Sequence, residues 1–295
     1  MSSDNPIILV PTGFSPQSLT AVDQAISYAH HTNGRVVLLT ITDPTSLWSS
    51  FLEQDEENAL IRSKIEEKLR SLAAQFEGRG VEIETRIEEG AVYEIVSIVA
   101  DEIGADIIIM GTNGAPKGLR KRFIGSNALR TVSSAPCPVI TIKGAEHNIG
   151  IKNIILPLDL TKETKQKVGK AIKLAKLYGS AIHAVSVIST KDDFVVKHLK
   201  ANMRQVHDFI EKEGVVVKSD FIAPIGDESM ASALIHFGVE RKGDLMVIMT
   251  QEETKVSEFF VGSLAQKLIY FSPIPVMSLR PRQLTLTSGA SGYGI

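Results

Sequence analysis

The stretch "PIILVPTGFSPQSLTAVDQAISYA", residues 6–29, decides the fold because a similar stretch occurs a second time in the chain. Its counterpart, "NIILPLDLTKETKQKVGKAIKLA", occupies residues 153–175. The matching positions, separated by a constant shift of 146, include Pro11 and Pro157, Ser15 and Thr161, and Ala25 and Ala171. Each copy begins with a short apolar run typical of a strand buried on both faces. Ser15 or Thr161 then stands where its hydroxyl would cap the following helix.

A second pair of similar segments lies near the end of each copy. "FIGSNALRTVSSAPCPVITI" occupies residues 123–142 and "FVGSLAQKLIYFSPIPVMSL" occupies residues 260–279. Because the features keep their order and only the intervening lengths differ, we interpret the chain as a duplication. The expected domains are residues 1–147 (first module), 148–281 (second module) and 282–295 (a flexible tail of small and polar residues).

Strand-like and helix-like patterns alternate within each copy. In the first copy the expected strands contain "IILVP", "RVVLLTIT", "VEIETRIEEG", "ADIIIMG" and "CPVITI", with helices between them. Apolar residues at helical spacing mark one long amphipathic helix in each copy: Leu60, Ile65, Leu69, Leu72 and Phe76, then Phe194, Val195, Leu199, Met203, Val206 and Ile210. Strands joined by helices predict an α/β, Rossmann-like fold of two doubly wound, mostly parallel five-stranded sheets with helices on both faces.

The bulk composition excludes several classes of protein. Hydrophobic residues make up 43% of the 295 residues, and the net charge of −2 gives no support for nucleic-acid binding. No apolar run approaches the roughly 18 residues that a membrane span needs. A single cysteine, Cys137, and a polar N-terminus without a signal pattern favour the cytoplasm. Residues 1–147 hold 13 basic and 19 acidic side chains, and the remainder holds 19 and 15, so the modules have different surfaces.

The first module contains a stretch whose chemistry favours an anion: "GTNGAPKGLRKRFIGS", from Gly111 to Ser126. Gly111 closes an expected strand, and ligands of open α/β sheets lie beyond the carboxyl ends of the strands. Glycines there let a phosphate approach the backbone, and the free N–H groups of a helix that begins near Ser126 attract negative charge. The stretch also contains four cations, Lys117, Arg120, Lys121 and Arg122, which a solvated loop face explains equally well. The stretch therefore favours a polyphosphate ligand.

The order of the motifs "VPTGFS", "GTNG", "GS" and "PCPV" resembles that of the universal stress protein family, here as a tandem over about residues 6–143 and 152–280. The resemblance implies that the first module binds ATP, with Mg²⁺ as a further ligand. Carried over by position, it implies nucleotide-binding residues at Thr12, Gly13 and Ile41 for the base or ribose, and at Gly111, Gly114, Gly125, Ser126 and Asn127 for the phosphates. It also implies an intrachain pseudo-dimer in which the last strands of the two modules meet edge to edge.

The first module departs from the family pattern at two places. Gly13 stands where the family's ATP-binding members carry an aspartate, and the spacing between Gly114 and Gly125 is one residue longer than usual. A carboxylate that accepts a hydrogen bond from ribose or adenine contributes about 1–3 kcal/mol, or roughly ten- to a hundredfold in affinity. Its absence weakens nucleotide binding without abolishing it.

The second module departs in the opposite way. Asp159 supplies the carboxylate, but Met249 or Thr250 replaces the first glycine of the phosphate loop. Glu252 or Glu253 stands in place of the second glycine, and a carboxylate there repels phosphate. Only the pair Gly262-Ser263 is kept, so we expect little or no ATP binding here, and a helix-start or turn role for Asp159.

No dedicated catalytic set is found in the sequence, so we do not expect an enzyme, although slow ATP hydrolysis stays open. The seven histidines show no metal-ligand spacing, and Cys137 between two prolines has packing as its expected role. The leading hypothesis is a stress-response sensor or regulator that binds an adenine nucleotide and acts on a protein partner. The alternative is a nucleotide-independent scaffold with vestigial clefts. Another small anion or an apolar ligand, and a homodimer in addition to the module pair, also stay open.

Overall fold

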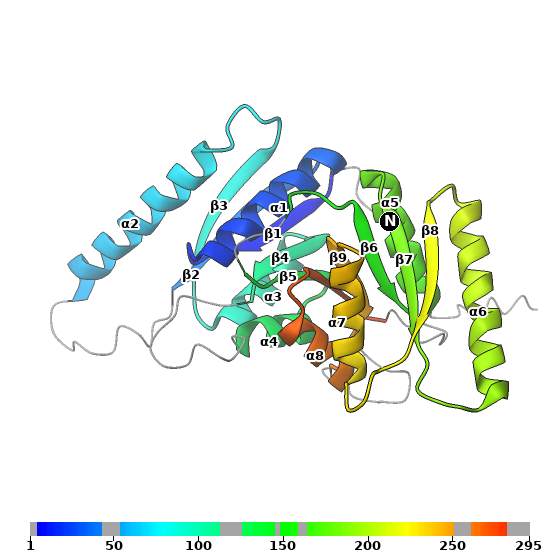
Figure 1. Ribbon diagram of the computed structural model, residues 1–295. Helices are drawn as coiled ribbons and strands as arrows, with labels where there is room; N and C mark the ends of the chain where they lie inside the picture. The colour runs from blue at the N-terminus through cyan, green and yellow to red at the C-terminus, as the bar shows by residue number, and fades with distance from the viewer. Residues whose placement is uncertain are drawn as a thin grey trace, which may run out of the picture.

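The computed structural model describes residues 5–42, 54–112, 126–144, 148–158, 164–250 and 261–281 (Figure 1). The first module contains β1 (Ile7–Pro11), α1 (Pro16–Thr32), β2 (Arg35–Thr42), α2 (Gln54–Ala74), β3 (Glu82–Glu89), α3 (Val92–Glu102), β4 (Ile107–Gly111), α4 (Ser126–Ser134) and β5 (Val139–Ile142). The second contains β6 (Asn153–Pro157), α5 (Thr164–Tyr178), β7 (Ala181–Val187), α6 (Asp193–Lys212), β8 (Val217–Ile222), α7 (Met230–Glu240), β9 (Leu245–Met249), α8 (Ser263–Phe271) and β10 (Val276–Leu279). Strands and helices alternate in both halves, as the α/β class requires.

The strands form one continuous ten-stranded sheet, in the order β3-β2-β1-β4-β5-β10-β9-β6-β7-β8. Each module supplies five strands that run parallel to one another, as predicted, and the two five-stranded halves are continuous with each other. The halves join where β5 and β10 pair antiparallel, with Met277 opposite Ile140. This is the edge-to-edge meeting of last strands that the family resemblance implied. Two otherwise unpaired edge strands satisfy each other's backbone groups in this way.

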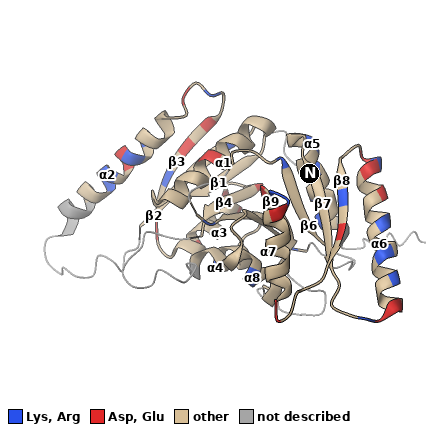
Figure 2. Cartoon of the chain, viewed as in Figure 1, with Lys and Arg blue, Asp and Glu red and all other residues tan. Residues whose placement is uncertain are grey.

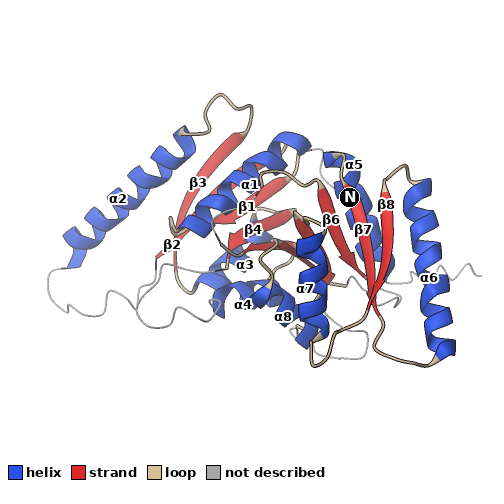
Figure 3. Cartoon of the chain, in the orientation of Figure 1, coloured by secondary structure: helices blue, strands red, loops and turns tan. Residues whose placement is uncertain are grey.

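Helices cover both faces of the sheet (Figure 3), and each face has its own apolar cluster. Buried side chains of α1, α2, α5 and α6 pack on one face, and those of α3, α4, α7 and α8 pack on the other. The central strands are buried on both sides, which explains their nearly continuous apolar sequence, whereas the edge strands β3 and β8 are half-exposed and carry charges.

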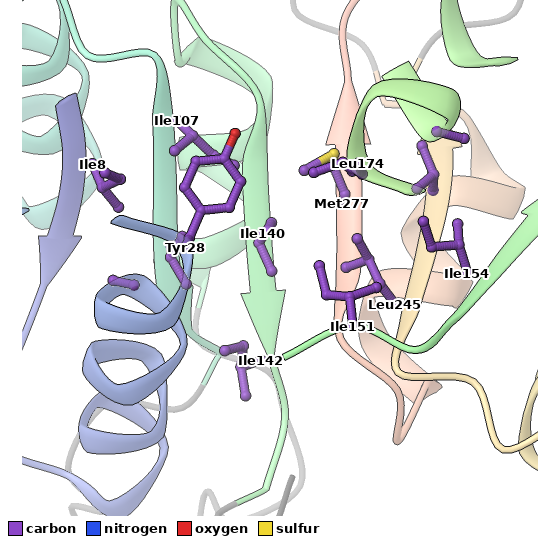
Figure 4. Close-up of a cluster of buried hydrophobic side chains, with 14 of the residues drawn as sticks. Ile8, Tyr28, Ile107, Ile140, Ile142, Ile151, Ile154, Leu174, Leu245 and Met277 are labelled. Atoms are coloured by element: carbon purple, nitrogen blue, oxygen red, sulfur yellow. The ribbon is translucent and has the colours of Figure 1, made fainter. Parts of the chain in front are cut away.

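One apolar cluster runs without interruption across the module boundary. Ile140 of β5 lies opposite Met277 of β10, and Ile142, Tyr28 of α1 and Leu174 of α5 belong to the same cluster (Figure 4). Two matching polar contacts add to the joint on the other face: Lys143 Nζ donates to the Tyr270 carbonyl at 3.1 Å, and Arg280 Nη1 donates to the Ala135 carbonyl at 3.1 Å. The two modules therefore share a core and pack as one unit.

The two long amphipathic helices are present, but part of each predicted apolar face is wrong. In α2, Leu69 and Leu72 are buried, whereas Leu60 is 55% exposed. In α6, Met203 and Ile210 are buried, whereas Phe194 is 79% exposed and Val195 is exposed as well. Periodicity identifies the side of a helix that faces the sheet, but it does not reveal how far the sheet extends beneath the helix.

Charged side chains gather on the outer elements α2, β3, β8 and α6 and on α5, while the central strands carry few (Figure 2). Within the described ranges, no helix is long and apolar enough to cross a membrane.

Candidate functional site

The candidate site of the first module lies at the carboxyl edge of its strands. In the sheet, β1 lies between β2 and β4, and all three run parallel, so their last residues meet at one edge. Thr12 and Gly13 follow β1, Ile41 is near the end of β2, and Gly111 ends β4. The structure therefore brings these three predicted segments to the same edge. Their role as ligand-binding residues stays a prediction.

Thr12 is held within the turn that leads from β1 into α1. It is 4% exposed, and its hydroxyl donates to Ser18 Oγ at 3.2 Å and accepts from the Phe14 N–H at 3.2 Å. Its carbonyl accepts from Thr40 Oγ1 at 3.0 Å. Ser15 caps α1 by accepting from the Ser18 N–H, which confirms the predicted cap, while its counterpart Thr161 lies outside the described residues. The turn is thus fixed by hydrogen bonds, which presents the next residue, Gly13, in a defined position.

Gly13 is exposed. Among the described residues, no atom outside its chain neighbours lies within 4 Å of the position that a Cβ at Gly13 would take. The neighbouring Phe14 has the left-handed backbone angle φ 58°, an uncommon conformation for a bulky side chain that the sequence did not reveal. The Phe14 ring packs against the core, and Lys68 Nζ of α2 lies 5.7 Å from its centroid. The position of the family's aspartate is therefore open to a side chain in this protein.

Gly111 has a packing reason to be a glycine. A Cβ on it would lie 3.0 Å from the backbone carbon of Gln17 and 3.0 Å from the backbone nitrogen of Ser18. Contacts under 3.4 Å are tighter than almost all real Cβ contacts, and backbone atoms do not move aside easily. This glycine lets the first turn of α1 approach the end of β4, independently of any ligand.

The register of the sheet identifies the counterpart of Gly111 in the second module. Gly111 pairs with Ile142, and Met249 pairs with Leu279, at matching ends of β5 and β10. The next residues agree, because the Thr112 N–H donates to the Ile142 carbonyl and the Thr250 N–H donates to the Leu279 carbonyl, each at 2.9 Å. Of the two candidates that the sequence left open, Met249 therefore replaces the glycine.

The two threonines that follow these positions differ in their hydrogen bonds. Thr250 Oγ1 donates to the Leu279 carbonyl at 3.2 Å. Thr112 is 2% exposed, and its Oγ1 has no hydrogen-bond partner among the described residues. A buried hydroxyl without a hydrogen-bond partner costs free energy, so the Thr112 hydroxyl at the edge of the candidate site is a candidate for contact with a ligand. No sequence pattern singles out Thr112, because a threonine follows in both modules, after Gly111 and after Met249.

The glycine–serine pair of the second module belongs to a closed helix start. The Gly262 N–H donates to the Thr250 carbonyl at 2.8 Å, and Gln266 Nε2 donates to the Val261 carbonyl at 2.7 Å. Gly262 is the N-cap of α8 and Ser263 is its first residue. These bonds hold the start of α8 against the end of β9, and the partly buried Met249 packs against the core.

Several predicted residues lie outside the described part of the chain: Gly114, Lys117, Arg120, Lys121, Arg122, Gly125, Asp159, Glu252 and Glu253. Ser126 and Asn127 are the first two residues of α4, where backbone N–H groups lack helical acceptors. Among the described residues, no three His, Cys, Asp or Glu side chains are grouped so as to hold a metal ion. Cys137 is partly buried against one apolar cluster, and this burial raises its pKa to about 12.

This geometry defines a tandem of two doubly wound α/β modules joined through their last strands. The universal stress protein family matches residues 5–143 and 150–280, so the chain belongs to that family. It is 31% identical to the universal stress protein MJ0531 of Methanocaldococcus jannaschii over 138 residues, which cover 46% of this chain and 81% of that protein.

Solved structures share the tandem fold. A universal stress protein from Archaeoglobus fulgidus superposes with a TM-score of 0.73 at 20% identity, over 95% of this chain and 98% of that one. The Pseudomonas aeruginosa protein PA1789 gives 0.64 at 17% identity, over 94% and 93%. At these identities the likeness is one of fold.

Proposed function

We propose that this universal stress protein is a stress-response sensor or regulator whose first module binds ATP, while its second module binds little or none. The observation that carries the proposal is the difference between matching strand ends: Thr112 after Gly111 has a buried hydroxyl without a partner among the described residues, whereas the Thr250 hydroxyl after Met249 donates to the Leu279 carbonyl. The first strand end therefore has a buried hydroxyl that a ligand would satisfy, whereas the hydroxyl at the second strand end is already satisfied.

Three further features support a ligand at the carboxyl edge of β1, β2 and β4. The turn after β1 is held rigid by the Thr12 and Ser15 hydrogen bonds, and Gly13 borders open space. The first turn of α4 offers N–H groups and the positive end of the helix dipole to a phosphate. The glycine pattern from Gly111 to Ser126 resembles that of the family's ATP-binding members.

Mg²⁺ would enter this site with the nucleotide. Protein sites bind Mg²⁺ through one or two carboxylates together with substrate phosphates and water. No group of three ligating side chains is present in the described residues, so we expect phosphate oxygens and water to supply most of its ligands.

Calorimetric titration of the full chain with ATP and Mg²⁺ tests the proposal, after a denatured sample has been checked for nucleotide that copurified. We expect a stoichiometry near one. The variant Gly114→Glu introduces into the first module the carboxylate that the second module carries, and it should abolish the heat. The matched control Ser263→Ala, at the start of α8, should leave the titration unchanged.

Three results would contradict the proposal. If no heat and no copurified nucleotide are found, the protein is a scaffold with vestigial clefts. If two sites are found, both modules bind. If Ser263→Ala removes the signal, the second module is the one that binds. The protein partner, a homodimer and the cytoplasmic location stay predictions from the sequence.

A further inference from the structure

The second module contains a buried histidine at a position where the first module has valine. His183 is the third residue of β7, it is 5% exposed, and it pairs with Ile155 on β6. Its counterpart is Val37, the third residue of β2, which is fully buried and pairs with Leu9 on β1. A titratable ring thus replaces an aliphatic side chain within the same layer of the fold.

Hydrogen bonds fix which ring nitrogen of His183 carries the proton. Asn153 Nδ2 donates to the Lys242 carbonyl at 3.2 Å, which turns Asn153 Oδ1 toward the ring. His183 Nε2 lies 3.2 Å from this oxygen and must donate to it. Nδ1 is therefore the unprotonated nitrogen, and it is buried without a hydrogen-bond partner in the described residues. A proton added to Nδ1 would find no acceptor.

The charges around His183 oppose a second proton. Lys218 lies opposite it on β8, and Arg241, the C-cap residue of α7, is the other nearby cation. The nearby carboxylate is Asp220, which already accepts a hydrogen bond from Arg241 Nη2 at 3.1 Å. Burial, followed by the charges of Lys218 and Arg241, lowers the pKa of His183, against a smaller opposing effect of Asp220.

The first module lacks every part of this arrangement. Glu84 lies opposite Val37, where Lys218 lies opposite His183. Ile7 begins β1, where Asn153 begins β6, and Ile103 is the C-cap residue of α3, where Arg241 is that of α7. Strands β7 and β8 also form one end of the sheet, with α6 packed beside them (Figure 1), and a sheet edge is a region that opens at low cost.

We propose that the outer part of the second module, formed by β7, β8, α6 and α7, is an acid-responsive element that opens at mildly acidic pH while the first module stays closed. In the unfolded chain a histidine has a pKa of about 6.5 and takes up a proton below that pH, whereas the burial and charges around His183 in the folded protein oppose its protonation. The contribution of His183 to the free energy of unfolding is therefore fully present above about pH 6.5. It is lost as the pH falls toward the lower pKa that the histidine has in the folded state.

Hydrogen exchange of the full chain, followed by mass spectrometry and corrected for intrinsic rates, measures this opening. It should be compared at about pH 7.5 and about pH 5, on either side of the ordinary histidine pKa of about 6.5. On going from about pH 7.5 to about pH 5, we expect the protection of β7, β8 and α7 to fall more than that of β2, β3 and α3. The difference should reach at most about 30-fold, which is the value for a histidine that stays neutral in the folded state.

The matched variant combines Asn153→Ile with His183→Val, which reproduces the Ile7 and Val37 pair of the first module. It should remove the excess loss of protection, and the exposed control His198→Gln should keep it. NMR titration of His183 in the wild-type protein provides a test that does not depend on the variant folding. An unchanged acid response in the double variant, equal loss in both modules, or titration of His183 at its ordinary pKa would each overturn the proposal.

Discussion

The two modules are built on the same framework but differ at the carboxyl ends of their strands. At the amino ends of the strands, Asp106 Oδ2 accepts from the Ile7 N–H at 3.0 Å, and Asp244 Oδ2 accepts from the Asn153 N–H at 2.9 Å. At the carboxyl ends, the first module has glycine at the position where the second has methionine. After the duplication, the aspartates at the amino ends kept their chemistry, whereas the residues at the carboxyl ends diverged.

The comparison also separates two reasons for a glycine. A Cβ on Gly111 would lie 3.0 Å from the α1 backbone, so packing limits the residue at this position whether or not a ligand binds. A Cβ on Gly13 would meet no neighbour among the described residues, so nothing in that part of the chain requires a glycine there. A motif glycine can therefore be structural, and a missing aspartate can be restored without strain.

The largest expected effect comes from replacing Gly111 of the first module by methionine, the residue that the second module has at the matching position. Gly111→Met places a side chain against Gln17 and Ser18, and we expect a loss of about 1–3 kcal/mol in the free energy of unfolding, as for an overpacked core. ATP binding should be lost with it, because the start of α1 and the turn at Gly13 must shift. Denaturant unfolding and calorimetry measure the two effects.

The reciprocal variant Met249→Gly is the control for that transfer. It should leave the affinity for ATP unchanged, because the site is in the other module. Equal loss of ATP binding in both variants would show that the two strand ends are not functionally different.

The next effect concerns the open position at the end of β1. Gly13→Asp should raise the affinity for ATP by about tenfold to a hundredfold, since a hydrogen bond to a carboxylate contributes about 1.5–3 kcal/mol. Gly13→Asn, of the same shape but without charge, should gain much less. Calorimetry that finds no gain with aspartate would place the ribose and base elsewhere.

The smallest expected effect is on the free energy of unfolding, which should respond differently when the matched threonines Thr112 and Thr250 are each replaced by valine. Thr112→Val removes a buried hydroxyl without a described partner, so stability should stay equal or rise by up to about 1 kcal/mol. Thr250→Val removes the bond to the Leu279 carbonyl, and stability should fall by about 1 kcal/mol. Thermal unfolding of both variants checks this, and a loss of similar size in each would mean that Thr112 is bonded in solution.

The sequence by itself determined the repeat, the alternation of strands and helices, the Ser15 cap and the family. These features depend on local patterns: apolar runs, helical spacing, and a hydroxyl beside the first turn of a helix. The resemblance also correctly implied that the last strands meet, because that pairing is common to the family.

Only the tertiary structure decided the remaining points. It joined the ten strands into one sheet, matched Met249 rather than Thr250 to Gly111, left Phe194 exposed, and buried His183 beside Lys218 and Arg241. Each of these depends on which distant segments become neighbours. A local pattern fixes the direction in which a side chain points, but its burial, its partners and its pKa are set by elements far away in the sequence.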